Sequence, residues 1–432
     1  NLHQKDLRYL EYALLEQGAP MPFKSFPITV PEAKTYLDRF DAELLSAQSD
    51  TSLAYYNQYL NKQYLYSEAT GFKFNADIEP MLETFWHWNI SNNFNLDLRN
   101  YRWAHGYEER QSMLNIPLEA SILDILFVRT CVTAKESHTT VNNSENDYGV
   151  TNHFNWIDFA DPKIDLYFPF QSYASLQGEH WNVQLGRDKL TWGNGQTGNH
   201  VLSDYSDFYD YLLVSTFWDA FKFSTVYSVM DPYSPRDEND DGSIGDSITY
   251  SAFIGHRFDM RFFNRLNVAI NETVTWANYY PTLVKDLNSL FVYHNWTIPE
   301  RTNSMMSLET EYMPWKYFYL YAQVAMDEFA MKYENDRDGG GGPNTWGWIA
   351  GVRGVYPFGP GFIKADVEWV HADAGLYHRR GAPYYYNVRR IWSLVTDQYE
   401  YIVKPIGHEI GPDAILWHWE VGYDWFPYLE TT

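Results

Sequence analysis

The segment Trp181–His200, WNVQLGRDKLTWGNGQTGNH, poses the choice that decides the fold of this chain. Its first half alternates: Trp181, Val183 and Leu185 share one face of an extended strand, and the residues between them are polar or small. The strand ends in an Arg-Asp pair, and a glycine-rich polar turn with one tryptophan follows. Such a strand has either a protein core or lipid against its apolar face. The rest of the chain must distinguish the two.

Composition narrows the classes of protein to which the chain can belong. It has 432 residues, with 56 acidic side chains against 32 basic ones and a formal charge of -24. This acidity disfavours a nucleic-acid partner, since phosphate contacts need clustered lysine and arginine. Aromatic residues make up 18% of the chain. A membrane barrel can place them at its interfaces, whereas a soluble protein would have to bury them. The single cysteine, Cys131, excludes an internal disulfide.

The ends of the chain suggest export and a missing terminus. No stretch of about 18 uninterrupted apolar residues occurs, so the sequence predicts no membrane-spanning helix. The chain begins at Asn1 without an initiator methionine or a signal sequence, as a processed, exported chain would. It closes on WFPYLETT, which has the character of a turn, whereas outer-membrane barrels usually finish on a strand. We therefore expect one or more C-terminal strands beyond Thr432.

Residues 1–70 have helical periodicity and form the first predicted domain, a helical cap. Leucines recur three and four residues apart before Gly18, which is a helix stop signal. Two more amphipathic stretches predict helices at 28–45 and at 51–65, the latter with Thr51 as its cap. Each stretch carries charge on its outer side, so the cap is predicted to be a small packed helical unit.

Residues 71–432 form the second predicted domain, because the hydrophobic period changes there to two. Apolar and polar residues alternate in FKFNADI (72–78), NFNLDLRN (93–100), FYLYAQVAMDE (318–328) and WHWEVGYDW (417–425). The residues predicted to share the apolar face include Phe72, Phe74, Leu96, Leu98, Leu320, Val324, Trp417 and Trp419. There are roughly sixteen or seventeen such segments, each about long enough to cross a bilayer at a tilt.

The polar faces of these strands favour a membrane barrel over a soluble sandwich. They mix amides, histidines, arginines and carboxylates, with few of the Lys, Glu and Thr runs that cover soluble sheets. Opposite charges also sit close together, as in Asp97 with Arg99 and Arg187 with Asp188. Such pairs suit a closed interior in which polar groups satisfy one another. The predicted fold is therefore mainly β, a transmembrane antiparallel β-barrel with a small N-terminal helical cap, and the soluble sandwich is the alternative.

A series of motifs occurs in the order found in one family. The segment at 7–37, LRYLEYALLEQGAPMPFKSFPITVPEAKTYL, joins a glycine turn to a proline-led helix, and GRDKLTWGNG (186–195) joins a strand to a Trp-Gly-x-Gly turn. FYLYAQVAMDEF (318–329) is a late strand with an inward Gln and acid. EWVHAD, YYYNVRR and KPIGHEIGPDAILW follow. Over most of the chain, this series resembles the Wzi capsule-assembly family of outer-membrane β-barrel lectins.

The resemblance implies both a fold and a function. It implies an outer-membrane barrel of about eighteen strands, without enzymatic activity, whose helical cap lies on the periplasmic side. It also implies a lectin that anchors surface or capsular polysaccharide to a Gram-negative-type cell. Outer-membrane lipid and lipopolysaccharide would be its other partners.

The candidate site residues have two interpretations, which stay open here. They contact polysaccharide, or they form a network that fills the lumen. Sugar binding uses aromatic rings against the CH faces of pyranoses and planar polar groups for hydroxyls, whereas a filled lumen needs mutually paired charges. The candidates are Arg187, Asp188, Trp192, Asn194, Asn199, Gln323, Asp327, Glu328, Arg379, Arg380, Tyr385, Arg389 and Arg390.

The sequence contains no catalytic or nucleotide-binding motif that would identify an enzyme. We therefore predict no enzymatic activity and no cofactor. The stretch DENDDG resembles the first half of a calcium loop at Asp237, Asn239 and Asp241, but Ile248 stands where that loop needs a bidentate Glu. We expect an exposed acidic loop, with a weak calcium site as the alternative.

The lumen separates the function classes that remain: a polysaccharide lectin, a porin-like channel whose acidity favours cations, and a soluble carbohydrate-active β-protein. A barrel of about eighteen strands leaves an aqueous channel unless something fills it. The segments 136–162 and 375–411 are long enough to fold inward. We expect 375–411 to do so, and its arginines to meet Asp327, Glu328 or Glu368.

Overall fold

The structure is a computed structural model that describes residues 2–37, 45–60, 65–67, 71–81, 112–136, 164–167, 171–233, 249–278, 302–328, 344–378, 386–393, 400–425 and 429–430. The hydrogen bonds between its strands follow the pattern of a closed antiparallel barrel. The chain has two compact units, one formed by residues 1–62 and 175–432 and one by residues 63–174, and each is described by itself. Within the described residues, no helix is both long and apolar enough to span a membrane.

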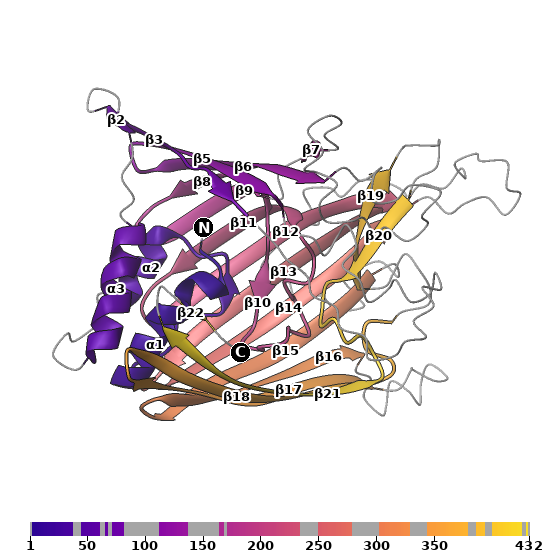
Figure 1. Ribbon diagram of the computed structural model, residues 1–432. Coiled ribbons are helices and arrows are strands. Elements are labelled where there is room, and N and C mark those ends of the chain that lie inside the picture. Colours follow the sequence, from indigo (N-terminus) through magenta and orange to yellow (C-terminus); the bar gives the residue numbers. More distant parts are fainter. Residues whose placement is uncertain are drawn as a thin grey trace, which may run out of the picture. The chain divides into compact units, whose positions relative to one another are not determined.

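The larger unit is built on one long antiparallel sheet (Figure 1). Strand β9 pairs with β11, each strand from β11 to β18 pairs with the next, and β21 pairs with β18 and β22. The strands are β9 (Trp181–Asp188), β11 (Tyr209–Phe217), β12 (Phe221–Tyr233), β13 (Thr249–Phe262), β14 (Leu266–Asn278), β15 (Thr302–Trp315), β16 (Phe318–Glu328), β17 (Thr345–Phe358), β18 (Gly361–Ala372), β21 (Ala414–Trp425) and β22 (Leu429–Glu430). Strand β8 (Ser172–Gln177) spans the boundary between the units.

Burial along these strands is inverted relative to that of a soluble protein. In β16, Leu320 is 43% exposed, whereas Tyr321 and Gln323 are buried. In β21, Trp417 and Trp419 are 67% and 77% exposed. In water, each Å² of apolar surface left exposed instead of being buried in a core would cost about 25 cal/mol of folding free energy. The apolar faces therefore meet lipid, which confirms the predicted membrane barrel over the soluble sandwich.

Strand β9, at the start of the opening segment, follows the predicted alternation. Trp181 and Leu185 are 43% and 65% exposed, while Asn182 and Gln184 are buried on the other face. Asp188 is also buried on that inward face. The apolar face of this strand therefore meets lipid, and its polar side chains belong to the interior.

The two ends of the larger unit's strands differ. At one end the strands join in short turns, as between Phe262 and Leu266. At the other end the connections are long, as from Asn278 to Thr302. Exposed aromatic side chains collect at the short turns: Trp218, Phe262, Phe263, Trp315, Tyr356 and Phe358. Outer-membrane barrels have short turns on the periplasmic side and aromatic girdles at the interfaces.

The smaller unit consists of further antiparallel strands of the barrel. Its strands are β2 (Leu65–Ser67), β3 (Phe72–Ala76), β4 (Glu79–Pro80), β5 (Leu114–Ile122), β6 (Leu126–Glu136) and β7 (Ile164–Tyr167). Leu123 and Asp124 turn the β5–β6 hairpin with positive φ angles of 54° and 58°, as a tight hairpin turn requires. Phe72 is 39% exposed, as predicted, whereas Leu96 and Leu98 lie outside the described residues.

Three helices lie among the described residues of 1–60: α1 (Arg8–Gln17), preceded by the 3-10 turn η1 (Gln4–Leu7), α2 (Val30–Leu37) and α3 (Ala47–Leu60). The backbone of Gly18 adopts the left-handed conformation, with φ 71°, and its N–H caps the end of α1, as predicted. Helix α3 begins earlier than predicted. Thr51 lies inside it and donates a hydrogen bond to the Ala47 carbonyl, so it is not the cap.

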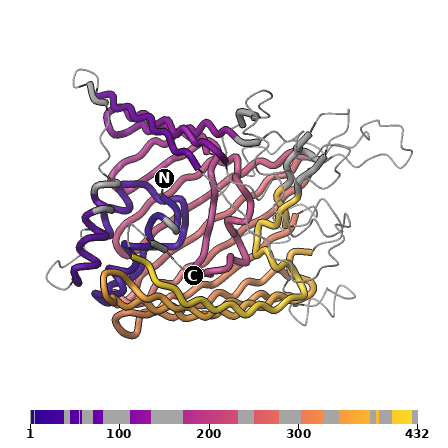
Figure 2. The backbone as a smooth tube through the Cα atoms, viewed as in Figure 1, coloured from indigo at the N-terminus to yellow at the C-terminus, as the bar shows by residue number. Residues whose placement is uncertain are grey.

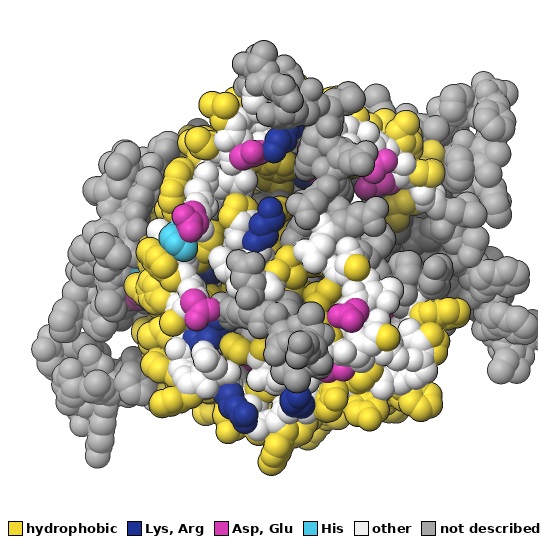
Figure 3. All heavy atoms as spheres, turned by 90° about the vertical axis from the view of Figure 1, so that its left-hand side faces the viewer, with side chains coloured by type: hydrophobic (Ala, Val, Ile, Leu, Met, Phe, Trp, Pro, Cys, Tyr) yellow, Lys and Arg dark blue, Asp and Glu magenta, His cyan; other side chains and the backbone are white. Residues whose placement is uncertain are grey.

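The helices lie at the short-turn end of the larger unit's sheet (Figure 1). In the β15–β16 turn, Tyr317 donates its N–H to the Leu15 carbonyl at 2.8 Å. The Tyr12 ring of α1 packs against Phe362 at the start of β18, with ring centroids 5.1 Å apart. Figure 3 shows this end of the molecule, where acidic and basic side chains are interspersed and hydrophobic side chains gather toward the border.

The lipid-facing assignment can be tested with a charged substitution in β9. Leu185→Arg should destabilise the folded protein in lipid vesicles by about 2–4 kcal/mol, because it places a charge on the lipid face. The control is Phe263→Arg at a short turn, which should cost at most about 1 kcal/mol because it lies at an interface. Denaturant unfolding followed by tryptophan fluorescence measures both. Equal losses would contradict the assignment of Leu185 to lipid.

Candidate functional site

Segments from three parts of the chain fill the interior of the larger unit. We call them the plug: residues 21–28, residues 190–203, and residues 373–378 together with 406–408. Strand β1 (Ser25–Phe26) pairs antiparallel with β10 (Thr191–Trp192), which joins the first segment to the second. Figure 2 shows both segments running across the inside of the curved sheet. The candidate site is therefore this filled interior.

The first plug segment is fixed to strands β12, β13 and β14. Arg261 and Asn267 donate hydrogen bonds to the Met21 carbonyl at 2.8 and 3.0 Å. The guanidinium of Arg261 also lies over the Phe23 ring, 4.5 Å from its centroid. Arg261 therefore satisfies a backbone carbonyl and covers an aromatic ring at the same time.

A second set of contacts ties the same segment to helix α2. The ammonium of Lys222 donates to the Ser25 carbonyl at 2.9 Å and forms an ion pair with Glu32 at 2.7 Å. Lys222 and Glu32 are 1% and 2% exposed. Ser25 also donates to Asp259 at 3.1 Å. Helix α2 and the segment that precedes it are therefore held by groups that have been removed from water.

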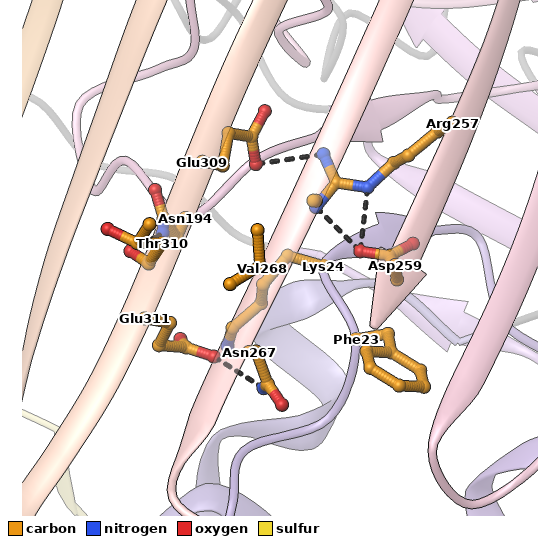
Figure 4. Close-up of a pocket in the computed structure, with 11 residues that line it drawn as sticks. Phe23, Lys24, Asn194, Arg257, Asp259, Asn267, Val268, Glu309, Thr310 and Glu311 are labelled. Atoms are coloured by element: carbon orange, nitrogen blue, oxygen red, sulfur yellow. Dashed lines mark hydrogen bonds and ion pairs between the residues drawn. The ribbon is translucent and has the colours of Figure 1, made fainter. Parts of the chain in front are cut away.

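A small polar pocket lies between Phe23, Lys24 and the inner faces of β13, β14 and β15 (Figure 4). Arg257 lines this pocket and donates to Asp259 at 2.9 Å and to Glu309 at 2.8 Å. Gln323 and Asn271 donate to the other oxygen of Glu309, at 2.7 and 2.6 Å. Most of the side chains that line the pocket are polar, and Asp259 and Glu309 are paired with Arg257.

Lys24 brings a cation from the plug into this network. It forms an ion pair with Glu11 of α1. Burial would lower the pKa of Lys24, but the carboxylates of Glu11 and Glu311 outweigh that effect and hold the pKa above its ordinary value. Lys24 therefore stays charged and neutralises part of the interior's excess acid.

The glycine-rich turn of the second plug segment lies against the middle of the strands. A Cβ on Gly195 would come within 2.0 Å of the Gly198 carbonyl oxygen, so the turn closes only with glycine there. The backbone N–H groups of Gln196 and Thr197 donate to Glu368 of β18 at 2.7 and 3.0 Å. A polar, glycine-rich turn after a strand would be expected at the barrel mouth, whereas this turn is buried in the interior. The inward-facing carboxylate of Glu368 accepts hydrogen bonds from the free backbone N–H groups of the turn, and these bonds hold the turn in the interior.

The second and third plug segments together form a buried cluster of two histidines and a tyrosine. His200 Nδ1 lies 2.8 Å from the Tyr377 hydroxyl, which accepts a hydrogen bond from the His408 N–H at 3.1 Å. Burial, together with the nearby His408, lowers the pKa of His200 to about 3, and burial lowers that of His408 to about 4. Both rings are therefore neutral at physiological pH and act as hydrogen-bonding groups.

Five of the predicted site residues are brought together in this interior. Trp192 is 1% exposed, beside Gly255. Asn194 donates to the Thr310 carbonyl at 2.9 Å, and Asn199 accepts from the Gly195 N–H at 3.0 Å. Gln323 accepts from the His200 N–H at 2.7 Å. Asp327 accepts from the Tyr377 N–H at 2.6 Å. Their positions favour the network interpretation for these five residues.

Arg187 and Asp188 are not paired with each other, contrary to the expectation from their proximity in sequence. Consecutive strand residues point to opposite faces, so a neighbouring pair cannot share one. Arg187 instead pairs with Asp210 at 2.7 Å, and buried Asp188 lies 3.2 Å from His3 Nε2.

The remaining candidates lie wholly or partly outside the described residues. Glu328 ends β16, and Arg389 and Arg390 belong to β19 (Asn387–Ser393), which pairs with β20 (Glu400–Pro405), but the structure does not describe their side chains. Residues outside the description are Arg379, Arg380, Tyr385, Asp97, Arg99, the segment 137–163 and the calcium candidates Asp237, Asn239 and Asp241. Segment 375–411 does enter the interior in part. Glu368, however, accepts from backbone amides and from Tyr321 and Thr197, where arginines were expected.

The comparisons with known proteins agree on the fold. No protein-family model and no curated protein matches the chain. Among solved structures, the chain is similar to Wzi, an outer-membrane protein involved in group 1 capsule assembly in Escherichia coli and a carbohydrate-binding β-barrel. The TM-score is 0.56 at 12% sequence identity, over 97% of this chain and 80% of Wzi.

Two other solved structures are more distant. OmpT, an outer-membrane protein of Vibrio cholerae, has a TM-score of 0.32 at 8% identity, over 72% of this chain and 89% of its own. An anion-selective porin from Comamonas acidovorans has a TM-score of 0.30 at 11% identity, over 60% and 68%. These scores are too low to carry an argument. The match to Wzi alone shows that the fold is Wzi-like, and the protein is an outer-membrane β-barrel.

The charge network can be tested at its centre. Arg257→Ala should destabilise the protein by about 3–5 kcal/mol, because it leaves Asp259 and Glu309 buried without their cation. Arg187→Ala is the matched control, since its pair with Asp210 is partly exposed and should be worth at most about 1 kcal/mol. Chemical unfolding in detergent measures both losses. A loss for Arg257→Ala no larger than that for the control would show that the interior pairs contribute little.

Proposed function

We propose that the protein is a non-enzymatic outer-membrane barrel that binds surface or capsular polysaccharide and anchors it at the cell surface. The observation that carries the proposal is the plug. Its backbone and side chains are buried and hydrogen-bonded to the inner faces of β12 to β18, where a diffusion channel needs a continuous water path. The Wzi-like fold supports it, since Wzi is a carbohydrate-binding barrel.

The proposal separates two groups among the candidate residues. Trp192, Asn194, Asn199 and Gln323 hold the plug in place, because all four are buried. Polysaccharide contacts are then assigned to the long connections at the end opposite the helices. Among the candidates, Tyr385 with Arg379 and Arg380, in the sequence between β18 and β19, offers an aromatic ring and planar donors for sugar hydroxyls.

The same reasoning orients the protein in the membrane. The helices lie at the end where strands join in short turns and exposed aromatics collect, which is the periplasmic end of outer-membrane barrels. The long connections then face outward, toward the polysaccharide. Lipid and lipopolysaccharide would contact the apolar outer face, for example at Trp417 and Trp419.

A porin-like channel is the second candidate function, because the acidity of the chain would favour cations in an open lumen. We expect the purified protein to show only small conductance in a planar bilayer. Replacing residues 194–199 with a short Gly-Ser linker should raise the conductance, because it removes the turn whose backbone N–H groups donate to Glu368. Phe263→Ala, at a short turn away from the plug, should leave the conductance unchanged. Large, steady currents from the unmodified protein would favour the channel.

Binding tests the lectin directly. In detergent, the full-length protein should bind purified bacterial surface polysaccharides saturably on an array, and it should ignore a neutral storage glucan. Arg379→Ser with Arg380→Ser should weaken that binding, whereas Arg187→Ser should not. An array on which no surface polysaccharide binds would remove the lectin proposal, whatever the conductance.

A further inference from the structure

A second cluster of chemically active side chains lies on the inner face of β18 and β21, apart from the plug contacts. Asp366 and Glu420 are directly opposite each other in the β18–β21 register. His418 precedes Glu420 by two residues, so it points to the same side of the sheet. The pairing of the two strands therefore places an imidazole and two carboxylates on one small area.

The distances within this cluster match those between ligands of a shared cation. His418 Nε2 lies 3.2 Å from Asp366 Oδ1 and 3.9 Å from Glu420 Oε2, and one donor atom from each residue lies within 4.8 Å of the others. Zinc bonds to nitrogen and oxygen of about 2.0–2.2 Å place neighbouring donors roughly 3–3.6 Å apart. Only small side-chain rotations separate the cluster from that geometry.

Asp366 supplies an independent sign of a ligand. It is 4% exposed, and its Oδ1 atom is buried without a hydrogen-bond partner among the described residues. The facing imidazole nitrogen is close, but it does not make a hydrogen bond to that oxygen. Buried carboxylate oxygens are normally satisfied. A cation between the two atoms would satisfy both.

The charge around the cluster also favours a cation. Lys364 lies 2.9 Å from Glu420 Oε1 and 3.4 Å from Asp424 Oδ1. Lys364 contacts Oε1 of Glu420, and the other oxygen, Oε2, is the one that faces His418. Carboxylates outnumber cations in this part of the interior, where Asp366, Glu368, Glu420 and Asp424 face Lys364 and Arg353.

We propose that Asp366, His418 and Glu420 form a binding site for a divalent transition cation of the Zn²⁺ type. An imidazole with two carboxylates suits Zn²⁺ and leaves further coordination positions for water. Calcium and magnesium prefer sites made only of oxygen ligands, so the imidazole selects against them. The bound cation would join β18 to β21 through side chains as well as through their backbone hydrogen bonds.

The test is calorimetric titration of the chelator-treated, full-length protein in detergent with Zn²⁺. Saturable binding should be seen, and millimolar Mg²⁺ or Ca²⁺ should not compete. His418→Ala and Asp366→Asn should each remove one site or weaken it at least tenfold. His371→Ala is the matched control, because His371 lies on β18, the strand of Asp366, is 2.9 Å from Asp373, and is exposed to 30%, close to the 32% of His418.

Co²⁺ provides a second readout, since its visible absorption reports the geometry in which protein ligands hold it. The unmodified protein and His371→Ala should give the same spectrum, and His418→Ala should lose it. Circular dichroism checks that each variant is folded. If His418→Ala does not fold, His418→Gln takes its place. The proposal is overturned if the unmodified protein binds no Zn²⁺, or if the His418 and Asp366 variants bind it as the unmodified protein does.

Discussion

Arg257 is held between Asp259 and Glu309 in the interior. This pairing meets the constraint on which the rest of the structure depends, which is that buried acidic side chains need a positively charged partner. The outer face of the strands is largely apolar, and charged side chains such as those of Arg257, Asp259 and Glu309 point inward. The chain has 56 acidic residues against 32 basic ones, and the interior must therefore be neutralised with few cations. Arg257 serves two acids at once, and Gln323 and Asn271 complete the coordination of Glu309. Without such sharing, the desolvated acids would repel one another.

The plug follows from the same constraint. A wide barrel with polar inner faces can satisfy them with water or with its own chain. This chain supplies backbone N–H groups at Gln196 and Thr197 to Glu368, and it supplies Lys24 to the acids near the helices. Segments from the N-terminus, the middle and the C-terminal part of the sequence meet because each offers donors that the inner strands lack. The polysaccharide proposal and the metal proposal concern different parts of this interior and of the loops, and neither requires the other.

Much of the fold could be predicted from the sequence because its determinants are local. Alternation in β16 and β9 depends only on a period of two, and the end of α1 depends on the left-handed conformation of Gly18. The start of α3 was placed too late, because several polar residues of that helix could serve as its cap. Register and neighbour choice along the sheet depend on strand pairing, which periodicity does not encode.

The interior was harder to predict, because its contacts join residues that are far apart in the sequence. The candidates Asn194, Asn199 and Gln323 were found from their polarity, but the sequence could not show that Gln323 would accept from His200. Arg257, Asp259 and Glu309 were missed. The available signal was an inward position in a predicted strand combined with charge. Arg187 and Asp188 were paired wrongly for the opposite reason, since proximity in sequence was given more weight than the alternation of the strand.

The hydrogen bond from the Tyr12 hydroxyl to Asp424, at 2.7 Å, bears on how the protein assembles. Its partners are 412 positions apart, so the loop that it closes contains almost the whole chain. Contacts of such separation form late in folding, after local hairpins. Helix α1 can therefore dock fully only once β21 has been added to the sheet. The first helix of the chain thus responds to whether β21 is in place, and a chain arrested before β21 would leave the Tyr12 hydroxyl without its carboxylate partner.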